Sequence, residues 1–90
     1  MTSTPQQTDT TTVRVVVRYW AAAKQAAGTG SEELTGSTVD EVLAAAVAAH
    51  PALDPVAAVA TVLLDGRAVE RGAPVAPGMQ LEVLPPFAGG

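Results

Sequence analysis

The sequence predicts a single two-layer α+β domain, and three observations carry that prediction. The chain has 90 residues, which is enough for one small hydrophobic core. β-branched runs near both ends are typical of strands, and one amphipathic stretch between them is typical of a helix. A helix between early and late strands is expected to pack on one face of a mixed sheet of four to five strands.

The first predicted strand covers residues 12–20, after a polar segment, residues 1–11, that we expect to be a disordered tail. One face of the strand is expected to be core and carries Val15, Val17 and Tyr19. The other is expected to be partly solvated and carries Arg14, Val16, Arg18 and Trp20.

Residues 21–27 are strong helix formers, and Gly28 suits the position just beyond a helix end. Residues 28–31 then predict a turn, and residues 32–34 a short edge strand whose two glutamates point to opposite faces. The main helix is predicted to begin at Thr38 with a capping box completed by Glu41. It ends near His50, before a proline, and its apolar stripe is Val39, Val42, Leu43, Ala46 and Val47.

Residues 51–60 are rich in alanine and proline, and we expect a connection there. Asp65-Gly66 then lies between two strand-like pieces of residues 61–69 and predicts a hairpin. Residues 80–84 are the last predicted strand, with Leu81 and Val83 on one face. This order suits a β-grasp arrangement over residues 12–84, in which the first and last strands lie parallel at the sheet centre.

Composition excludes several classes of function. The chain has no cysteine, so we expect no disulfide framework, thiolate nucleophile or ordinary zinc site. Nine acidic and five basic residues give a net charge of −4 without a basic cluster, so nucleic acid is not an expected partner. We expect neither a membrane span nor a signal peptide, which makes the cytoplasm the expected compartment.

Candidate catalytic groups inside the domain are few. The single histidine, His50, is expected to have a structural or solvated role at a helix end. Ser-His-Asp and Cys-His arrangements are absent from the sequence, and the acidic pairs predict no metal site. We therefore expect no metal, no bound cofactor and no enzyme activity of the chain alone.

The last six residues, 85–90, are the strongest functional signal. Two prolines favour an extended stem, and the two final glycines have no side chains, so the end could enter a narrow channel. Six extended residues reach roughly 20 Å at ~3.3 Å each. We expect a flexible tail that carries one carboxylate into a partner's active site, formed by Pro85, Pro86, Phe87, Ala88, Gly89 and Gly90.

A second signal is an apolar patch near the tail. Trp20 is predicted to lie on the solvated face of the first strand, and Leu84 on the corresponding face of the last strand, with Ala68 of the hairpin beside them. Exposed apolar groups that cluster are typical of a docking surface.

The ending Val83-Leu84-Pro85-Pro86-Phe87-Ala88-Gly89-Gly90 resembles that of the MoaD/ThiS-type ubiquitin-like sulfur carriers, and is most similar to the small subunit of molybdopterin synthase. The resemblance covers residues 13–90 and includes Arg18-Tyr19-Trp20-Ala21-Ala22-Ala23-Lys24, the hairpin and the capped helix. It implies the β-grasp fold. The chain departs from the family at Ala68, where a larger apolar residue is common, and in its longer N-terminal segment.

The resemblance also implies a chemistry. An E1-like activating enzyme that consumes ATP adenylates the carboxylate of Gly90, and a sulfur donor protein converts it to a thiocarboxylate. The tail then enters the large subunit of molybdopterin synthase, within a heterotetramer, and gives its sulfur to cyclic pyranopterin monophosphate. Trp20, Ala68 and Leu84 match the family's contacts with the large subunit, and Phe87 lies on the tail.

Three alternatives stay open. One is a carrier for thiamine or cysteine synthesis, which the Pro-Pro stem disfavours. Another is a ubiquitin-like modifier joined to lysines through Gly90. The third is a binding module with an inert tail.

Overall fold

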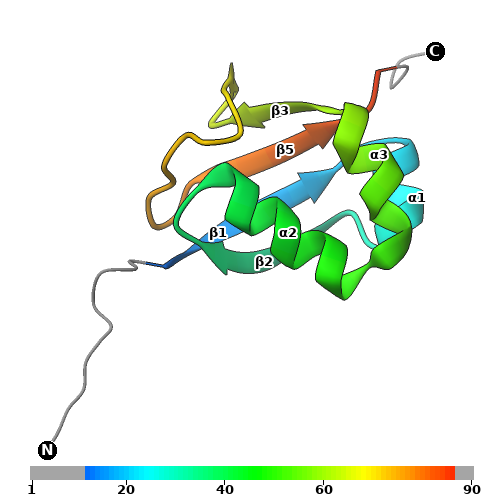
Figure 1. The fold of residues 1–90 in the computed structure, drawn as a ribbon, viewed down its shortest axis with the longest axis horizontal. Coiled ribbons are helices and arrows are strands. Elements are labelled where there is room, and N and C mark those ends of the chain that lie inside the picture. Colours follow the sequence, from blue (N-terminus) through cyan, green and yellow to red (C-terminus); the bar gives the residue numbers. More distant parts are fainter. Residues whose placement is uncertain (1–11, 87–90) are drawn as a thin grey trace, which may run out of the picture.

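A mixed five-stranded sheet forms one layer of the computed structural model, which describes residues 12–86 (Figure 1). The strand order is β2-β1-β5-β3-β4. β1 and β5 are parallel neighbours, and the other pairs are antiparallel. The strand bounds are β1 Val13–Tyr19, β2 Ser31–Gly36, β3 Thr61–Leu64, β4 Arg67–Ala68 and β5 Gln80–Leu84. The predicted β-grasp arrangement, with the first and last strands side by side, is confirmed.

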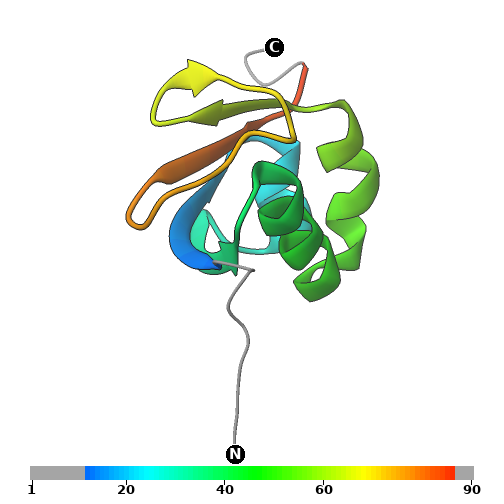
Figure 2. The same cartoon turned by 60° about the vertical axis from the view of Figure 1, so that its left-hand side comes forward.

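Helices form the second layer and cover one face of the sheet, which leaves the other face open (Figure 2). They are α1 Ala22–Ala27, α2 Val39–Ala49, the 3-10 helix η1 Pro51–Leu53 and α3 Asp54–Val59. α1 ends at Gly28 in the left-handed conformation, as its position predicts. α2 is the predicted main helix.

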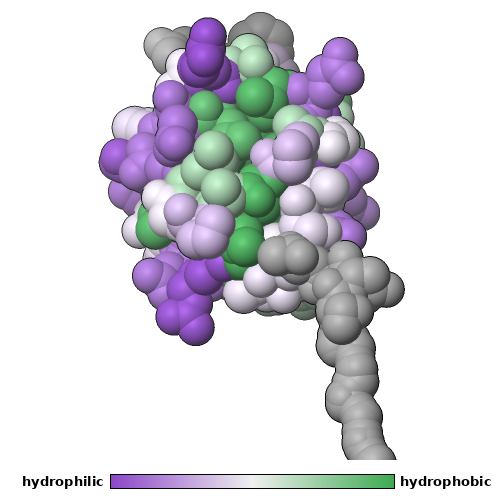
Figure 3. Space-filling view, turned by 90° about the vertical axis from the view of Figure 1, so that its left-hand side faces the viewer, coloured by the Kyte–Doolittle hydropathy of each residue, from purple (hydrophilic) through white to green (hydrophobic). Residues whose placement is uncertain are grey.

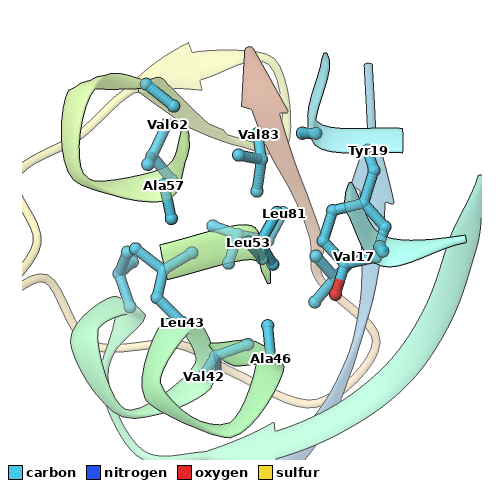
Figure 4. Close-up of a cluster of buried hydrophobic side chains, with 14 of the residues drawn as sticks. Val17, Tyr19, Val42, Leu43, Ala46, Leu53, Ala57, Val62, Leu81 and Val83 are labelled. Atoms are coloured by element: carbon cyan, nitrogen blue, oxygen red, sulfur yellow. The ribbon is translucent and has the colours of Figure 1, made fainter. Parts of the chain in front are cut away.

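The core lies between the two layers, and alternate residues of the strands point into it. Val17 and Tyr19 of β1, and Leu81 and Val83 of β5, are all at most 3% exposed. Figure 4 shows Leu53 of η1 among these sheet side chains and those of α2. With one tyrosine among the sixteen buried apolar residues of the described range, the core is built from small aliphatic groups that must fit closely.

The start of α2 differs in one detail from a capping box. The Thr38 hydroxyl accepts a hydrogen bond from the Glu41 backbone N–H at 3.2 Å, as predicted. The Glu41 carboxylate, however, reaches one residue further back and accepts from both the N–H and the hydroxyl of Ser37, at 2.8 and 2.6 Å. These bonds favour the ionised form and lower the pKa of Glu41.

The connection predicted over residues 51–60 is wrong, because these residues form η1 and α3. Prolines are tolerated in the first turn of a helix, where their missing N–H would have no partner, and here Pro51 and Pro55 occupy such positions. Burial of apolar side chains explains the folding of this segment: Leu53, Ala57 and Ala60 enter the core.

Residues 69–79 return along the end of the molecule at the left of Figure 1. Their carbonyls bind the start of α2: Val39 N–H donates to Ala73 at 2.9 Å, and Asp40 N–H to Arg71 at 2.7 Å. The Arg71 guanidinium in turn donates to the carbonyls of Ala57 and Ala60 at 2.8 and 2.9 Å. Figure 3 looks onto this end and shows a band of apolar surface between polar margins.

His50 has a structural partner, in line with the role expected for it. Its Nε2 lies 2.8 Å from a Glu32 carboxylate oxygen, which also accepts the Tyr19 hydroxyl at 2.6 Å. Burial, followed by the hydrogen bond to Glu32 and its charge, raises the pKa of Tyr19. The group joins the end of α2 to β1 and β2.

Two tight turns control the chain direction beside the sheet. The predicted β3–β4 hairpin is confirmed, and it turns through Asp65 and Gly66, both with positive φ (49° and 83°), as in a type I′ turn. The turn from β1 into α1 is type II′, closed by the bond from Ala23 N–H to the Trp20 carbonyl at 3.0 Å. Ala21 occupies its first central position, with φ 53° and ψ −124°.

Gly36 marks a close approach of β2 to α2, and we expect Gly36→Ala to be destabilising. A Cβ there would lie 2.8 Å from Val42 Cγ2 and 2.9 Å from the Val42 backbone N, and the backbone atom has little freedom to move away. Overpacking of this kind costs about 2 kcal/mol. Urea unfolding measures the loss, and Gly72→Ala, in open space, is the matched control.

Ala21 occupies a glycine-type conformation, and we expect Ala21→Gly to stabilise the fold. Strain of this kind costs on the order of 1–3 kcal/mol, which exceeds the entropy that glycine loses, so a net gain of about 1 kcal/mol is expected. Thermal unfolding measures it. Ala22→Gly, in the first turn of α1, should have the opposite sign; a loss of stability in Ala21→Gly would show that the alanine is unstrained there.

Candidate functional site

The stem of the tail leaves from the sheet centre. β5 runs parallel to β1, with Tyr19 opposite Val83, and the Trp20 N–H continues the pairing by donating to the Val83 carbonyl at 3.2 Å. Pro85 is buried and Pro86 is exposed, so the stem is anchored on the domain for one residue beyond β5. Phe87, Ala88, Gly89 and Gly90 lie outside the described residues.

Trp20 and Leu84 lie next to each other on the open face of the sheet, as the parity of the strands predicts. Their neighbours in register, Tyr19 and Val83, are paired and point into the core. Trp20 is 40% exposed, and the Arg18 guanidinium carbon lies 5.0 Å from the centroid of its ring. This cation–π contact favours the observed orientation of the indole.

Ala68 is not a direct neighbour of this pair, because β4 is separated from β5 by β3. Leu63 lies opposite both Ala68 on β4 and Glu82 on β5, whereas Leu84 lies opposite Thr61, so Leu63 is a direct neighbour of Ala68 and only a diagonal neighbour of Leu84 on the open face. The sequence reasoning missed Leu63, although parity could have found it: Val62 and Leu64 are buried, so the residue between them must point outward. We call Trp20, Leu63, Ala68 and Leu84 the open-face patch.

A groove at the root of the tail was not predicted. It has a volume of about 360 Å³ and is almost wholly apolar. Its walls are the start of α1, the outer side of α3 and the stem itself, and its lining residues are Ala21, Ala22, Pro55, Val56, Val59, Pro85 and Pro86. No strand or helix pattern could have indicated it, because α3 was itself unexpected.

Other site types have little support in the described part of the chain. Residues 12–86 contain no group of three or more His, Asp or Glu side chains placed to hold a metal ion. Within the same range, no helix has the length and apolar character needed to cross a bilayer. The geometry therefore offers apolar contact surfaces beside an anchored stem.

Comparison with known proteins identifies a family that matches this sequence. The ThiS family matches residues 17–90. Among curated proteins, no significant sequence match was found.

Several solved structures share the fold. The crystal structure of SAMP1 from Haloferax volcanii is 28% identical, with a TM-score of 0.77, over 86% of this chain and 99% of that one. A protein described as molybdopterin converting factor subunit 1, from Pyrococcus furiosus, is 25% identical, with a TM-score of 0.75, over 82% and 98%. Subunits 1 and 2 of the molybdopterin-converting factor of Helicobacter pylori form a complex whose matching chain is 22% identical, with a TM-score of 0.67, over 87% and 100%.

The family match covers most of the chain, and these structures share its fold. On this evidence the chain belongs to the ThiS family, the MoaD/ThiS-type ubiquitin-like sulfur carriers and modifiers.

Proposed function

We propose that this protein is the sulfur-carrier subunit of a molybdopterin synthase, with the carboxylate of Gly90 as its reactive group. The observation that carries the proposal is the anchored stem: the central strand β5 is followed by the buried Pro85, and five more residues follow Pro85. The family match extends to residue 90 and so includes the Gly-Gly end.

The chemistry needs a partner because a carboxylate is a poor electrophile. An E1-like enzyme transfers AMP from ATP to the Gly90 carboxylate and releases pyrophosphate, which creates a good leaving group. Sulfide released by the sulfur donor then attacks the acyl carbon, the C–O bond to AMP breaks, AMP leaves, and the product is a thiocarboxylate. The domain contributes no reacting group to these steps; it presents the tail and binds the partners.

The molybdopterin role is supported by the Pro-Pro stem and by the open-face patch. A large synthase subunit that takes the tail into its active site would also meet the open face of the sheet, which adjoins the end of β5 where the stem begins. Trp20 lies there in a cation–π contact with Arg18, and Leu63 and Leu84 add aliphatic surface. Two such carriers with two large subunits would give the heterotetramer.

A ubiquitin-like modifier is the second candidate, and the 28% identity to SAMP1, a small archaeal modifier protein, favours it. Both functions share the adenylated Gly90. They differ in the nucleophile that follows: sulfur in a carrier, and the amine of a lysine in a modifier.

Intact mass spectrometry tests the carrier chemistry. After incubation with a competent activating enzyme, ATP and a sulfur donor, the protein should gain the mass difference between sulfur and oxygen. Deletion of Gly89 and Gly90 should abolish the gain while the free energy of unfolding changes by less than about 1 kcal/mol, because terminal residues bury little surface. Deletion of Thr2 and Ser3, which removes as many residues from the other end, should leave the mass gain intact.

Complementation and incubation in cell extract separate the two functions. A carrier should restore molybdoenzyme activity in a strain lacking its own small subunit, and should form no ATP-dependent high-mass conjugates. Conjugates that disappear when Gly89 and Gly90 are deleted, without complementation, would support the modifier and overturn the molybdopterin proposal. The Trp20→Ala variant should reduce complementation and leave adenylation at Gly90 detectable.

A further inference from the structure

The stem leaves the domain between two apolar surfaces. The open-face patch lies on the sheet side, and the apolar groove lies on the helix side, between the start of α1 and α3 (Figure 1). The two surfaces meet along the chain at two points. Trp20 belongs to the patch, and the residue after it, Ala21, lines the groove. In the same way Leu84 belongs to the patch, and Pro85 after it lines the groove.

The exposed large apolar side chains of the molecule flank this stem. Within residues 12–86 there are two of them: Trp20 of the patch, 40% exposed, and Val59 of the groove, 63% exposed. The residues that line the groove include no charged side chain. Large apolar side chains left exposed beside a functional segment are typical of a surface that a partner covers.

The size of a stable interface indicates that a partner bound to the patch also covers the groove. Such an interface buries about 800 Å² on each partner, from roughly 20–30 residues, which is a disc of roughly 16 Å radius. The open-face patch is far smaller, and one of its members is the small side chain of Ala68. A footprint of the usual size around the stem therefore extends from the patch across Pro85 and Pro86 to the groove that these residues line.

We propose that the groove is the second half of the docking surface for the large synthase subunit. It receives an aliphatic or aromatic side chain from the mouth of the channel that takes up the tail, and Val56 and Val59 contact that side chain. The large subunit then holds the stem from the sheet side and from the helix side, which fixes the direction in which the stem enters. This inference rests on the proposed function, because the large subunit is the partner proposed there.

The large subunit is favoured over the activating enzyme because the two contacts differ in lifetime. An activating enzyme must release the carrier after each loading step, whereas the subunits of a heterotetramer stay together. Lasting complexes have larger and more hydrophobic interfaces than transient ones. A groove without charged side chains suits the lasting contact. A second copy of this chain is disfavoured, because a copy seated in the groove would stand against the stem and obstruct the protein that takes up the tail.

Isothermal titration calorimetry of the full chain with the large subunit tests the proposal. Val59→Asp should weaken binding about tenfold or more, because a carboxylate would be buried against an apolar side chain. Ala58→Asp is the matched control, since it adds the same charge at the neighbouring exposed position of α3 but lines a different groove, between α2 and α3. It should change the affinity by less than about twofold. Val59→Leu, which keeps an apolar side chain, should bind as the wild-type protein does.

NMR spectroscopy of the wild-type complex gives a readout that needs no variant. The methyl protons of Val56 and Val59 should show intermolecular nuclear Overhauser contacts to the large subunit. Absence of these contacts, or unchanged affinity in a folded Val59→Asp protein, would overturn the second docking surface and leave the proposed function standing. If Val59→Asp slows only the adenylation of Gly90, the groove belongs to the activating enzyme, which overturns the inference equally. A wild-type chain that does not bind the large subunit would overturn the proposed function together with it.

Discussion

The parallel pairing of β1 with β5 is the constraint on which the rest of the structure depends. Parallel neighbours cannot be joined by a tight turn, so the chain must cross the sheet between them, and it does so through α2 and α3. Because β5 is central and is the last strand of the described range, its end is supported on both sides. The stem therefore starts from a fixed point of the domain instead of from a fraying edge.

The second layer depends on small side chains. Alanines at Ala23, Ala46 and Ala57 are buried, which lets short helices lie close to the sheet and to one another. The Arg71 guanidinium donates hydrogen bonds to two carbonyls at the C-terminal end of α3, which have no partner within the helix. Its positive charge also interacts favourably with the helix dipole there. α3 in turn forms the wall against which the stem lies, so a polar contact on one side of this helix supports an apolar groove on the other.

The sheet and the main helix could be predicted from local patterns alone. Three kinds of pattern predicted them: the alternation in residues 13–19 and 80–84, the Asp-Gly turn and the apolar stripe of α2. Each pattern can be recognised from residues close together in the sequence, and each prediction is confirmed. α3 could not be found in this way, because an Ala/Pro-rich stretch has the same local appearance as a connection. Its helix forms because Leu53 and Ala57 gain burial against elements far away in sequence. The open-face patch was found in part: the alternation of β3 alone would have placed Leu63 on this face, but its position beside Ala68 needed the pairing of β3 with β4. The groove could be found only in the tertiary structure.

Both edges of the sheet discourage addition of another strand. β4 is only two residues long, and β2 carries Glu32 on its inward face, where a charge is accommodated by Tyr19 and His50 but would be poorly placed in an extended assembly. Self-association through backbone pairing is thereby hindered, although the sheet exposes one whole face. A domain whose edge strands are short or charged can expose an apolar binding face at high protein concentration without forming polymers through strand pairing.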